Sequence, residues 1–269
     1  MNMAGNRNTV RDSLERRLRG AEIETVRSLF GPDLRVLEIG GGSGYQASIL
    51  ASWGCDVVSL DIPERENPPK EYYTVQDYDG VNIPFPDESY DRVLSSNVLE
   101  HVRSLSPLLE EMHRVLKPEG LAVHILPSST WRLWTSVSHY GYVVKYLLRY
   151  LSKSPLPMPG LSTRVPTVTR IVTTHGPSRA VRRALYSPPH GEYPNALSEL
   201  YYYSKRRWVR VFSNNGFEVK RIANTGLFYT GYLLFPESSL NARRRMSLIL
   251  GSACNIFVMR KCENATPET

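Results

Sequence analysis

A glycine-rich loop that follows an acidic residue is the feature of this sequence that most directly suggests chemistry. The run Val36–Gly44 reads V-L-E-I-G-G-G-S-G, with glycines at positions 40, 42 and 44 and a carboxylate at Glu38. Glycines at this spacing let the backbone turn sharply and let a ligand approach without side-chain obstruction. Asp61 follows at the end of a second apolar run, where a carboxylate can accept hydrogen bonds from both hydroxyls of a ribose.

The loop differs from the one that binds dinucleotides. Those enzymes use G-x-G-x-x-G, whereas Tyr45 stands here where the third glycine would be, and the spacing is G-x-G-x-G. A carboxylate at Glu38 would repel a pyrophosphate, but it suits a cationic or amine-bearing ligand. The sequence therefore predicts a nucleoside cofactor that carries positive charge.

The elements that position these residues alternate between helices and strands in the first half of the chain. Apolar spacing predicts helices over Val10–Phe30, Tyr45–Trp53 and Ser104–Leu116. Short apolar runs predict strands over Leu34–Ile39, Asp56–Leu60, Tyr72–Val75, Arg92–Ser95 and Leu121–Leu126. Strands separated by helices of this length predict an α/β fold with a parallel sheet covered on both faces.

After Pro127 the sequence becomes rich in aromatic residues, proline and arginine. A helix is expected over Trp131–Leu151 and another over Lys205–Asn214, with strands over Phe217–Ile222 and Asn255–Lys261. The periodicity of residues 154–204 is too poor to predict elements there. Between the last two strands lies the segment 227–251, which has an apolar-aromatic front and the run Arg243-Arg244-Arg245.

Several motifs in order resemble the class I S-adenosylmethionine-dependent methyltransferases, in particular the broad methyltransferase type 11 group. Besides the glycine loop, they are I-P-F-P-D-E-S-Y-D (Ile83–Asp91), S-N-V-L-E-H-V (Ser96–Val102) and R-V-L-K-P-E-G (Arg114–Gly120). The resemblance covers about Leu34–Pro127. It implies a Rossmann-like, seven-stranded, mostly parallel sheet whose last strand, Asn255–Lys261, runs antiparallel.

The resemblance also implies contacts with S-adenosyl-L-methionine. It places Glu38 near the methionine amino group, the glycines 40, 42 and 44 beneath the cofactor, and Asp61 on the ribose. Asp77 or Tyr78 would contact the adenine, and Asn97 would lie at the methionine moiety. Asp79 is a second acidic candidate for the adenine; Asp77 is favoured because it directly follows the apolar strand residues.

On this interpretation the chain divides into four parts. Residues 1–30 form an N-terminal helical segment, and residues 31–127 form the Rossmann-like core that binds S-adenosylmethionine. Residues 128–204 form a helical, aromatic- and Arg-rich cap on the acceptor side. Residues 205–269 return to the core sheet and carry the inserted basic-aromatic segment 227–251.

Methyl transfer to a hydroxyl needs a proton acceptor near the reacting atom. His101 follows the fourth strand, at the sheet edge where class I enzymes place the transferred methyl group. His175 and His190 lie in the Pro/Gly-rich segment that would carry an acceptor loop. These three are the candidate catalytic histidines, and each has a structural alternative, which for His101 is to orient the helix that follows.

The charge of the chain divides between its two halves. The net charge of the 269 residues is +7, but residues 1–127 carry 13 Lys/Arg and 20 Asp/Glu, whereas residues 128–253 carry 18 Lys/Arg and 4 Asp/Glu. The basic segment predicts an anionic partner. Its arginines 164, 170, 179, 182 and 183 could hold a phosphate or carboxylate.

This segment supports three interpretations: an anionic or amphiphilic acceptor, peripheral membrane contact, or RNA binding. The favoured one is an anionic or amphiphilic small molecule, glycan or lipid-linked compound, and the segments Tyr140–Lys153 and Leu233–Leu250 suit peripheral contact with an anionic membrane. RNA ranks last because no RNA-binding module is recognisable. The aromatic residues could instead simply form the core of a cap. N-methylation of adenine or glutamine is disfavoured because the sequence after the fourth strand is Ser95-Ser96-Asn97-Val98 and not the Asn/Asp-Pro-Pro-Tyr motif of those enzymes. C5-methylation of cytosine is disfavoured because it needs a nucleophilic cysteine, and none of the three cysteines lies at such a position.

A non-catalytic protein that binds the cofactor or serves as a scaffold is the remaining alternative, since methyltransferase folds can lose activity. The cradle of Glu38, three glycines and Asp61 argues against it. The sequence shows no apolar run near the roughly 20 residues of a membrane span, no secretory signal and no metal-ligand spacing among three cysteines. A cytoplasmic protein, with the membrane-peripheral option open, is the expectation.

Overall fold

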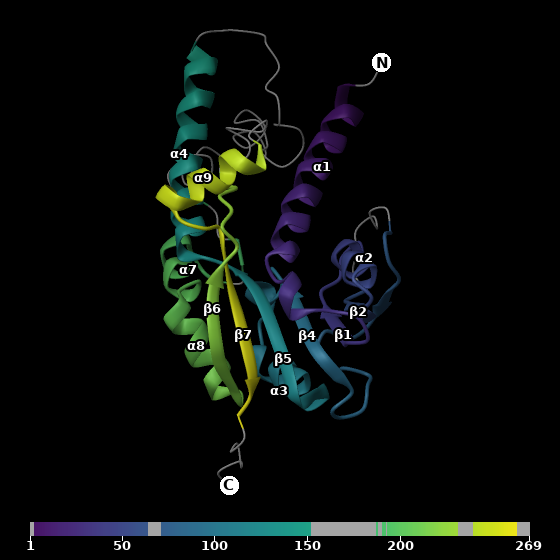
Figure 1. Ribbon diagram of the computed structural model, residues 1–269. Helices are drawn as coiled ribbons and strands as arrows, with labels where there is room; N and C mark the ends of the chain where they lie inside the picture. Colours follow the sequence, from purple (N-terminus) through teal and green to yellow (C-terminus); the bar gives the residue numbers. More distant parts are fainter. Residues whose placement is uncertain are drawn as a thin grey trace.

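A seven-stranded sheet forms the centre of the computed structural model, which describes residues 3–63, 71–151, 187, 190–191, 193–230 and 239–262. The strand order is β3-β2-β1-β4-β5-β7-β6 (Figure 1). The strands are β1 (Arg35–Ile39), β2 (Asp56–Asp61), β3 (Val75–Asp77), β4 (Tyr90–Ser96), β5 (Leu116–Pro127), β6 (Phe217–Asn224) and β7 (Cys254–Lys261).

The sheet is parallel from β3 through β5, and β7 runs antiparallel to both of its neighbours. β7 enters between β5 and β6, with Val123 opposite Val258 and Ile222 opposite Phe257. The predicted α/β class, with seven mostly parallel strands and an antiparallel last strand, is confirmed.

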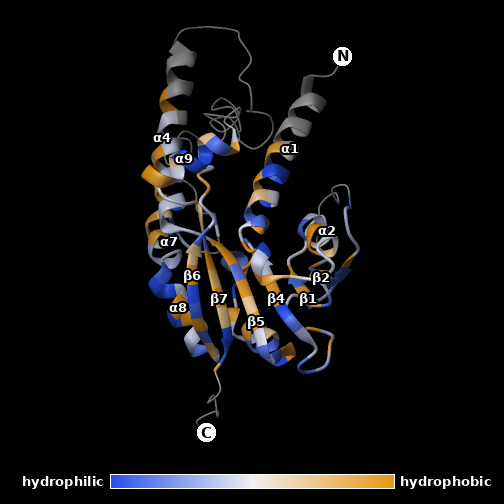
Figure 2. Ribbon diagram, in the orientation of Figure 1, coloured by the Kyte–Doolittle hydropathy of each residue, from blue (hydrophilic) through white to orange (hydrophobic). Residues whose placement is uncertain are grey.

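Two apolar clusters cover the two faces of the sheet. On one face the sheet packs against α3 (Leu105–Val115) and α8 (Lys205–Asn214), through side chains such as Met112 and Trp208. On the other face it packs against the end of α1 (Met3–Glu24) and against α2 (Tyr45–Ser52), through Ile23 and Leu50. Figure 2 shows the apolar residues along the central strands. Because both faces are covered, β1, β7 and the second half of β5 are continuous buried runs, whereas the edge strand β6 is mostly exposed.

The chain connections place a group of helices beyond the carboxyl ends of the parallel strands. α4 (Ser129–Leu151) leaves the end of β5, α7 (Ala196–Tyr202) packs against α4, and α9 (Leu240–Leu250) precedes β7. In Figure 1, α1, α4 and α9 all project from this end of the sheet. None of the helices in the described ranges combines the length and the apolarity that crossing a membrane requires.

The element boundaries differ from expectation in a few places. β3 begins at Val75 rather than Tyr72. β5 begins at Leu116 rather than Leu121, because the residues K-P-E-G, which were expected to follow the end of a helix, belong to the strand. The first helix ends at Glu24, and a short 3₁₀ turn follows at Arg27–Leu29. α7 lies where no element was predicted. It begins with a capping box between Asn195 and Ser198, a helix-start pattern that is hard to recognise because the residues before it show no regular periodicity.

Candidate active site

The glycine loop between β1 and α2 is in close contact with the loops that follow the neighbouring strands. A Cβ atom at Gly40 would overlap the side chain of Val98, and one at Gly44 would overlap the backbone of Tyr73. Both glycines have positive φ angles, 79° and 71°, which other residues rarely adopt. The packing around the loop therefore requires glycine at these two positions.

Gly42 differs from its neighbours because its missing side chain would point into open space. Its φ is 56°, and no described atom lies within 4 Å of a Cβ built there. Its backbone N–H donates to Oδ2 of Asp61 at 2.7 Å, while the N–H of Ile62 donates to Oδ1 at 2.8 Å. Asp61 thus fixes the loop against the end of β2, and the open side of Gly42 gives room for a ligand beside that carboxylate.

Glu38 is a buried acid directly beneath this loop. It is 2% exposed and accepts a hydrogen bond at 2.6 Å from Ser59 Oγ, its register partner on β2. Burial, together with the charge of Asp61, raises the pKa of Glu38 to about 7, although the Ser59 bond opposes the shift. A cation bound at the loop would favour the ionised form.

The end of β3 brings another acid beside Asp61. Asp77 pairs with Asp61 across the parallel strands β2 and β3, so both carboxylates lie at the same edge of the sheet. Tyr78 is half-buried, and burial together with the charges of Asp61 and Asp79 raises the pKa of its phenol to about 12. Asp79 instead binds its own loop, because its Oδ1 accepts the N–H groups of Val81 and Asn82 at 2.9 and 2.7 Å.

Asn97 follows β4 in a left-handed conformation, with φ 56° and its N–H donating to Ile125 O at 2.8 Å. Its side-chain oxygen accepts a weak bond from the thiol of Cys254 at 3.4 Å. That thiol also contacts Tyr229 Oη at 2.9 Å, and the same hydroxyl donates to Glu22 Oε1 at 2.9 Å. A buried polar chain therefore links Asn97 to helix α1.

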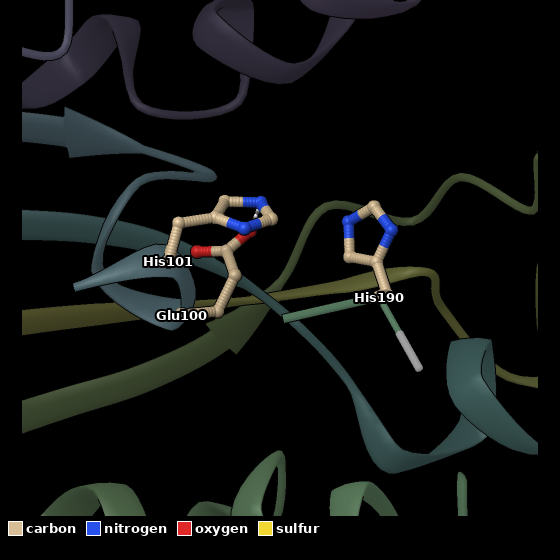
Figure 3. A group of neighbouring side chains, drawn as sticks. All are labelled: Glu100, His101 and His190. Atoms are coloured by element: carbon tan, nitrogen blue, oxygen red, sulfur yellow. Dashed lines mark ion pairs between the residues drawn. The ribbon is translucent and has the colours of Figure 1, made fainter. Parts of the chain in front are cut away.

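Two of the three candidate histidines come together beyond the end of β4. The rings of His101 and His190 lie 5.1 Å apart in an edge-to-face arrangement, and Trp131 packs on His190 at 4.7 Å. Glu100 completes the group: one ligand-type atom from each of Glu100, His101 and His190 lies within 4.8 Å of the others (Figure 3). His175 lies outside the described residues.

A buried ion pair holds the His190 loop in place. The backbone N–H groups of His190 and Gly191 both donate to Oε1 of Glu199 at 2.7 Å, and Arg132 Nε lies 2.8 Å from Oε2 of the same carboxylate. A Cβ at Gly191 would lie 2.6 Å from Glu100 O. The loop before α7 therefore packs directly against the turn that carries Glu100 and His101.

This environment shifts the pKa values of two members of the group. Burial raises the pKa of Glu100 to about 8, although the positive charge of Arg19 opposes the shift. Although His190 keeps part of its surface open to solvent, its ring is packed among neighbours. This partial burial, with smaller contributions from His101 and Arg132, lowers the pKa of His190 to about 4. His190 is therefore a neutral imidazole at neutral pH.

The structure accounts for part of the positive charge of the second half. Arg132 is 1% exposed and paired with Glu199, and Arg243 is 2% exposed with its guanidinium 3.3 Å from Phe228 O. These two arginines are structural. Arg207 lies over the rings of Trp208 and Tyr202, at 4.3 and 5.5 Å. The arginines expected to hold an anion, at 164, 170, 179, 182 and 183, lie outside the described residues.

Several residues that build the site carried no signal in the sequence analysis. Ser59 becomes recognisable only once the register of β1 and β2 is known, and Glu199 only once its contact with Arg132 is known. Trp131 was predicted as one aromatic residue of a helix, but its contact with His190 depends on the position of a loop far along the chain.

Comparison with known proteins agrees with this geometry. Residues 37–124 match the family model of the methyltransferase domain. An uncharacterized methyltransferase of Mycobacteroides abscessus is 40% identical over 105 residues, which are 36% of this chain and 40% of that protein. The biotin biosynthesis bifunctional protein BioHC of Cellvibrio japonicus is 33% identical over 126 residues, which are 43% of this chain and 25% of that protein.

A solved structure extends the likeness of the fold over most of the chain. An S-adenosylmethionine-dependent methyltransferase from Mesorhizobium loti has a TM-score of 0.51 at 17% identity, covering 90% of this chain and 98% of that one. The chain spans less than half the length of the two curated relatives. The residues that match the family model, 37–124, include the glycine loop.

The buried carboxyl of Glu38 leads to a prediction about stability without ligand. Its folded pKa of about 7 lies above its ordinary value of 4.5, so its contribution to the free energy of unfolding is complete below pH 4.5. That contribution declines as the pH rises and is lost once the pH passes about 7, a change on the order of 3 kcal/mol. Urea unfolding of the wild type and of Glu38→Gln between about pH 5 and pH 8 measures it. Equal pH profiles for the two proteins would contradict the assignment.

Proposed function

We propose that this chain, which carries a class I S-adenosylmethionine-dependent methyltransferase domain, transfers a methyl group to an anionic or amphiphilic acceptor. The acceptor classes are a small molecule, a glycan or a lipid-linked compound, and the favoured reaction is O-methyl transfer. The observation that carries the proposal is the open, left-handed Gly42 beside Asp61 and above the buried Glu38.

The residues at the glycine loop fit the cofactor. Asp61 keeps lone pairs for ribose hydroxyls beyond the two backbone N–H groups that it accepts, because a carboxylate offers about four acceptor positions. Glu38 can balance an ammonium group, and Gly42 leaves the backbone accessible. When bound, the sulfonium of S-adenosylmethionine supplies an already activated methyl group. The protein must then align the acceptor and exclude water.

The group beyond β4 supports an acceptor that reacts through oxygen. His101 and His190 bring imidazole rings to the end of the sheet where the methyl group would be transferred, and Trp131 gives an aromatic wall beside them. A hydroxyl acceptor needs such a group to handle its proton, whereas a free amine does not. Tyr193 and Tyr202, which are partly exposed and whose rings stack 3.9 Å apart, extend the aromatic surface suited to sugars or apolar groups.

Peripheral contact with an anionic membrane would accompany a lipid-linked acceptor. Leu248 and Ile249 on α9 are 85% and 87% exposed, and the exposed Arg244 and Arg245 stand on the same helix. Exposed aliphatic side chains beside arginines suit the interface of an anionic bilayer. This observation favours the lipid-linked class among the three.

The first prediction that follows from the proposed function concerns the open side of Gly42. Because Gly42→Ala places a Cβ where no described atom lies, the protein should fold, but the new methyl group should obstruct the cofactor and weaken its binding at least about tenfold. Isothermal calorimetry with S-adenosylmethionine measures this. Gly226→Ala is the matched control, since Gly226 also has a positive φ, 65°, and an open Cβ position.

The Gly226→Ala protein should bind the cofactor as the wild type does. Equal loss in both variants would show that backbone strain, and not obstruction, causes the effect. If the wild type binds no S-adenosylmethionine at millimolar concentration, the chain is neither an enzyme of this class nor a cofactor-binding scaffold.

The second prediction separates the two acids near the adenine. Asp77 lies beside Asp61 at the sheet edge, whereas Asp79 is engaged by the N–H groups of its own turn. We therefore expect Asp77→Ala to weaken S-adenosylmethionine binding by about tenfold, and Asp79→Ala by much less, in calorimetry at constant pH. A larger loss for Asp79→Ala would move the adenine contact to that residue.

The third prediction concerns the acceptor. Incubating a cell extract with methyl-labelled S-adenosylmethionine and the protein should place label in the small-molecule or lipid fraction, and not in RNA. The Gly42→Ala variant should give no label above background. Labelled RNA would favour the alternative RNA methyltransferase. No labelled fraction, together with intact cofactor binding, would favour the non-catalytic alternative.

A further inference from the structure

We propose that Glu100, His101 and His190 form a binding site for one divalent transition-metal ion, to which an oxygen atom of the methyl acceptor binds. This inference rests on the proposed methyl transfer and assigns the chemistry of its acceptor side. The three side chains meet beyond the end of β4, with Glu100 and His101 on one turn and His190 on a separate segment (Figure 3).

The geometry is close to that of a metal site. One carboxylate oxygen and two imidazole nitrogens all lie within 4.8 Å of one another, and His101 Nε2 is 3.8 Å from Glu100 Oε1. Ligand atoms about 2.1 Å from a shared ion lie about 3–4 Å apart. Because both histidines are at least partly exposed, small rotations of their side chains would bring the three atoms to that spacing.

The observation that most supports a metal ion here is that the Glu100 carboxylate is buried without a hydrogen-bond partner among the described residues. Three glutamates in this region are almost completely buried: Glu22, Glu100 and Glu199. Glu22 is paired with Arg19 at 2.7 Å, and Glu199 with Arg132 at 2.8 Å.

Glu100 differs from the other two glutamates. Among the described residues, neither of its carboxylate oxygens has a hydrogen-bond partner, and its exposure is 1%. A buried acid without such a partner costs several kcal/mol unless it is protonated or receives a cation. A metal ion held with two imidazoles supplies that cation.

The backbone segments that carry the ligands are held in position before any ion binds. The N–H of His190 is fixed to Glu199, and Gly191 fits against Glu100 O only because it has no Cβ. Trp131 packs against the His190 ring. Binding an ion would therefore immobilise little additional chain. Arg19 and Arg132, whose charges act on Glu100 and His190, are each paired with a glutamate of their own.

The ligand types favour particular metals. Two imidazoles and one carboxylate suit Zn²⁺, Mn²⁺, Fe²⁺, Co²⁺ or Ni²⁺ better than Mg²⁺ or Ca²⁺, which prefer oxygen ligands. Three protein ligands leave coordination positions open. An acceptor with a hydroxyl or carboxylate oxygen would occupy one of these positions, which agrees with an anionic acceptor.

The ion would promote loss of the proton from the acceptor hydroxyl, the role for which the histidines were first considered. A hydroxyl that coordinates to a divalent metal has a lowered pKa, so its proton leaves to solvent water. The electron pair on that oxygen then forms the bond to the methyl carbon, while the carbon–sulfur pair returns to the sulfonium sulfur. In this arrangement the imidazoles hold the ion and do not accept the proton.

The test uses Co²⁺ as a spectroscopic probe and the full chain. Visible absorption during titration should show one Co²⁺ per chain with the bands of a nitrogen- and oxygen-ligated ion, and Zn²⁺ should displace it. Glu100→Gln and His101→Gln should each weaken Co²⁺ binding at least about tenfold, because each removes one ligand. His139→Asn is the control, since His139 lies on α4 beside Tyr140 and outside the group.

Calorimetry with S-adenosylmethionine on the same proteins keeps the two proposals separate. Glu100→Gln should bind the cofactor as the wild type does and unfold at a similar urea midpoint, which shows that lost Co²⁺ binding is not lost folding. The metal site is excluded if the wild type gives no Co²⁺ bands and no Zn²⁺ heat at millimolar metal. It is also excluded if both ligand variants bind Co²⁺ with wild-type affinity. Intact cofactor binding in either case leaves the proposed function standing.

Discussion

The close approach of three loops at one end of β1 is the constraint on which the rest of the site depends. The glycine loop lies so near the loop after β4 and the segment before β3 that Gly40 has no room for a Cβ beside Val98, nor Gly44 beside Tyr73. Because side chains are excluded there, backbone N–H groups and the edge of Gly42 become the surface of the site. The same approach brings Asp61 and Glu38 beneath one small open region.

Charge within the fold follows from the same arrangement. The acidic half places Glu38 under the glycine loop beside Asp61, and the negative charge of these two carboxylates favours a cationic ligand. The basic half uses some of its arginines internally: Arg132 neutralises Glu199, and Arg243 contacts the carbonyl of Phe228. The positive charge that residues 128–253 could offer to an acceptor is therefore smaller than their net charge indicates. What distinguishes the acceptor side is a buried carboxylate, Glu100, next to imidazoles.

The sequence predicted the parts of the structure that depend on short-range patterns. Apolar runs ending in glycine or aspartate located β1 and β2, and the family resemblance implied seven strands of which the last, β7, runs antiparallel. The position of β7 between β5 and β6 was not predicted. The boundaries of β3 were displaced because Tyr72 and Tyr73 have the composition of a strand but pack against the glycine loop and α2 instead. Strand propensity cannot distinguish a tyrosine that belongs to a strand from one that packs against a neighbouring loop.

The acceptor side could not be predicted because its contacts join distant segments. His101 was identified from its place after a strand and His190 from its composition, yet nothing local indicates that they meet. Their meeting depends on Glu199, which looks like an ordinary surface acid of a short helix until Arg132 is placed beside it. Glu100 likewise reads as one residue of a motif, and only its burial shows that its carboxyl must either hold a proton or receive a cation.

This division explains where the likeness to known proteins begins and ends. The glycine loop and the acids beside it are local in sequence and constrained by backbone packing, and they lie within the residues 37–124 that match the family model. The acceptor side is built by the turn after β4, the start of α4 and the loop before α7. These segments can change while the glycine loop stays the same, because they meet it only at the end of the sheet. If the proposed methyl transfer is right, residues such as Trp131 and His190, which lie outside the matched residues 37–124, would select the acceptor.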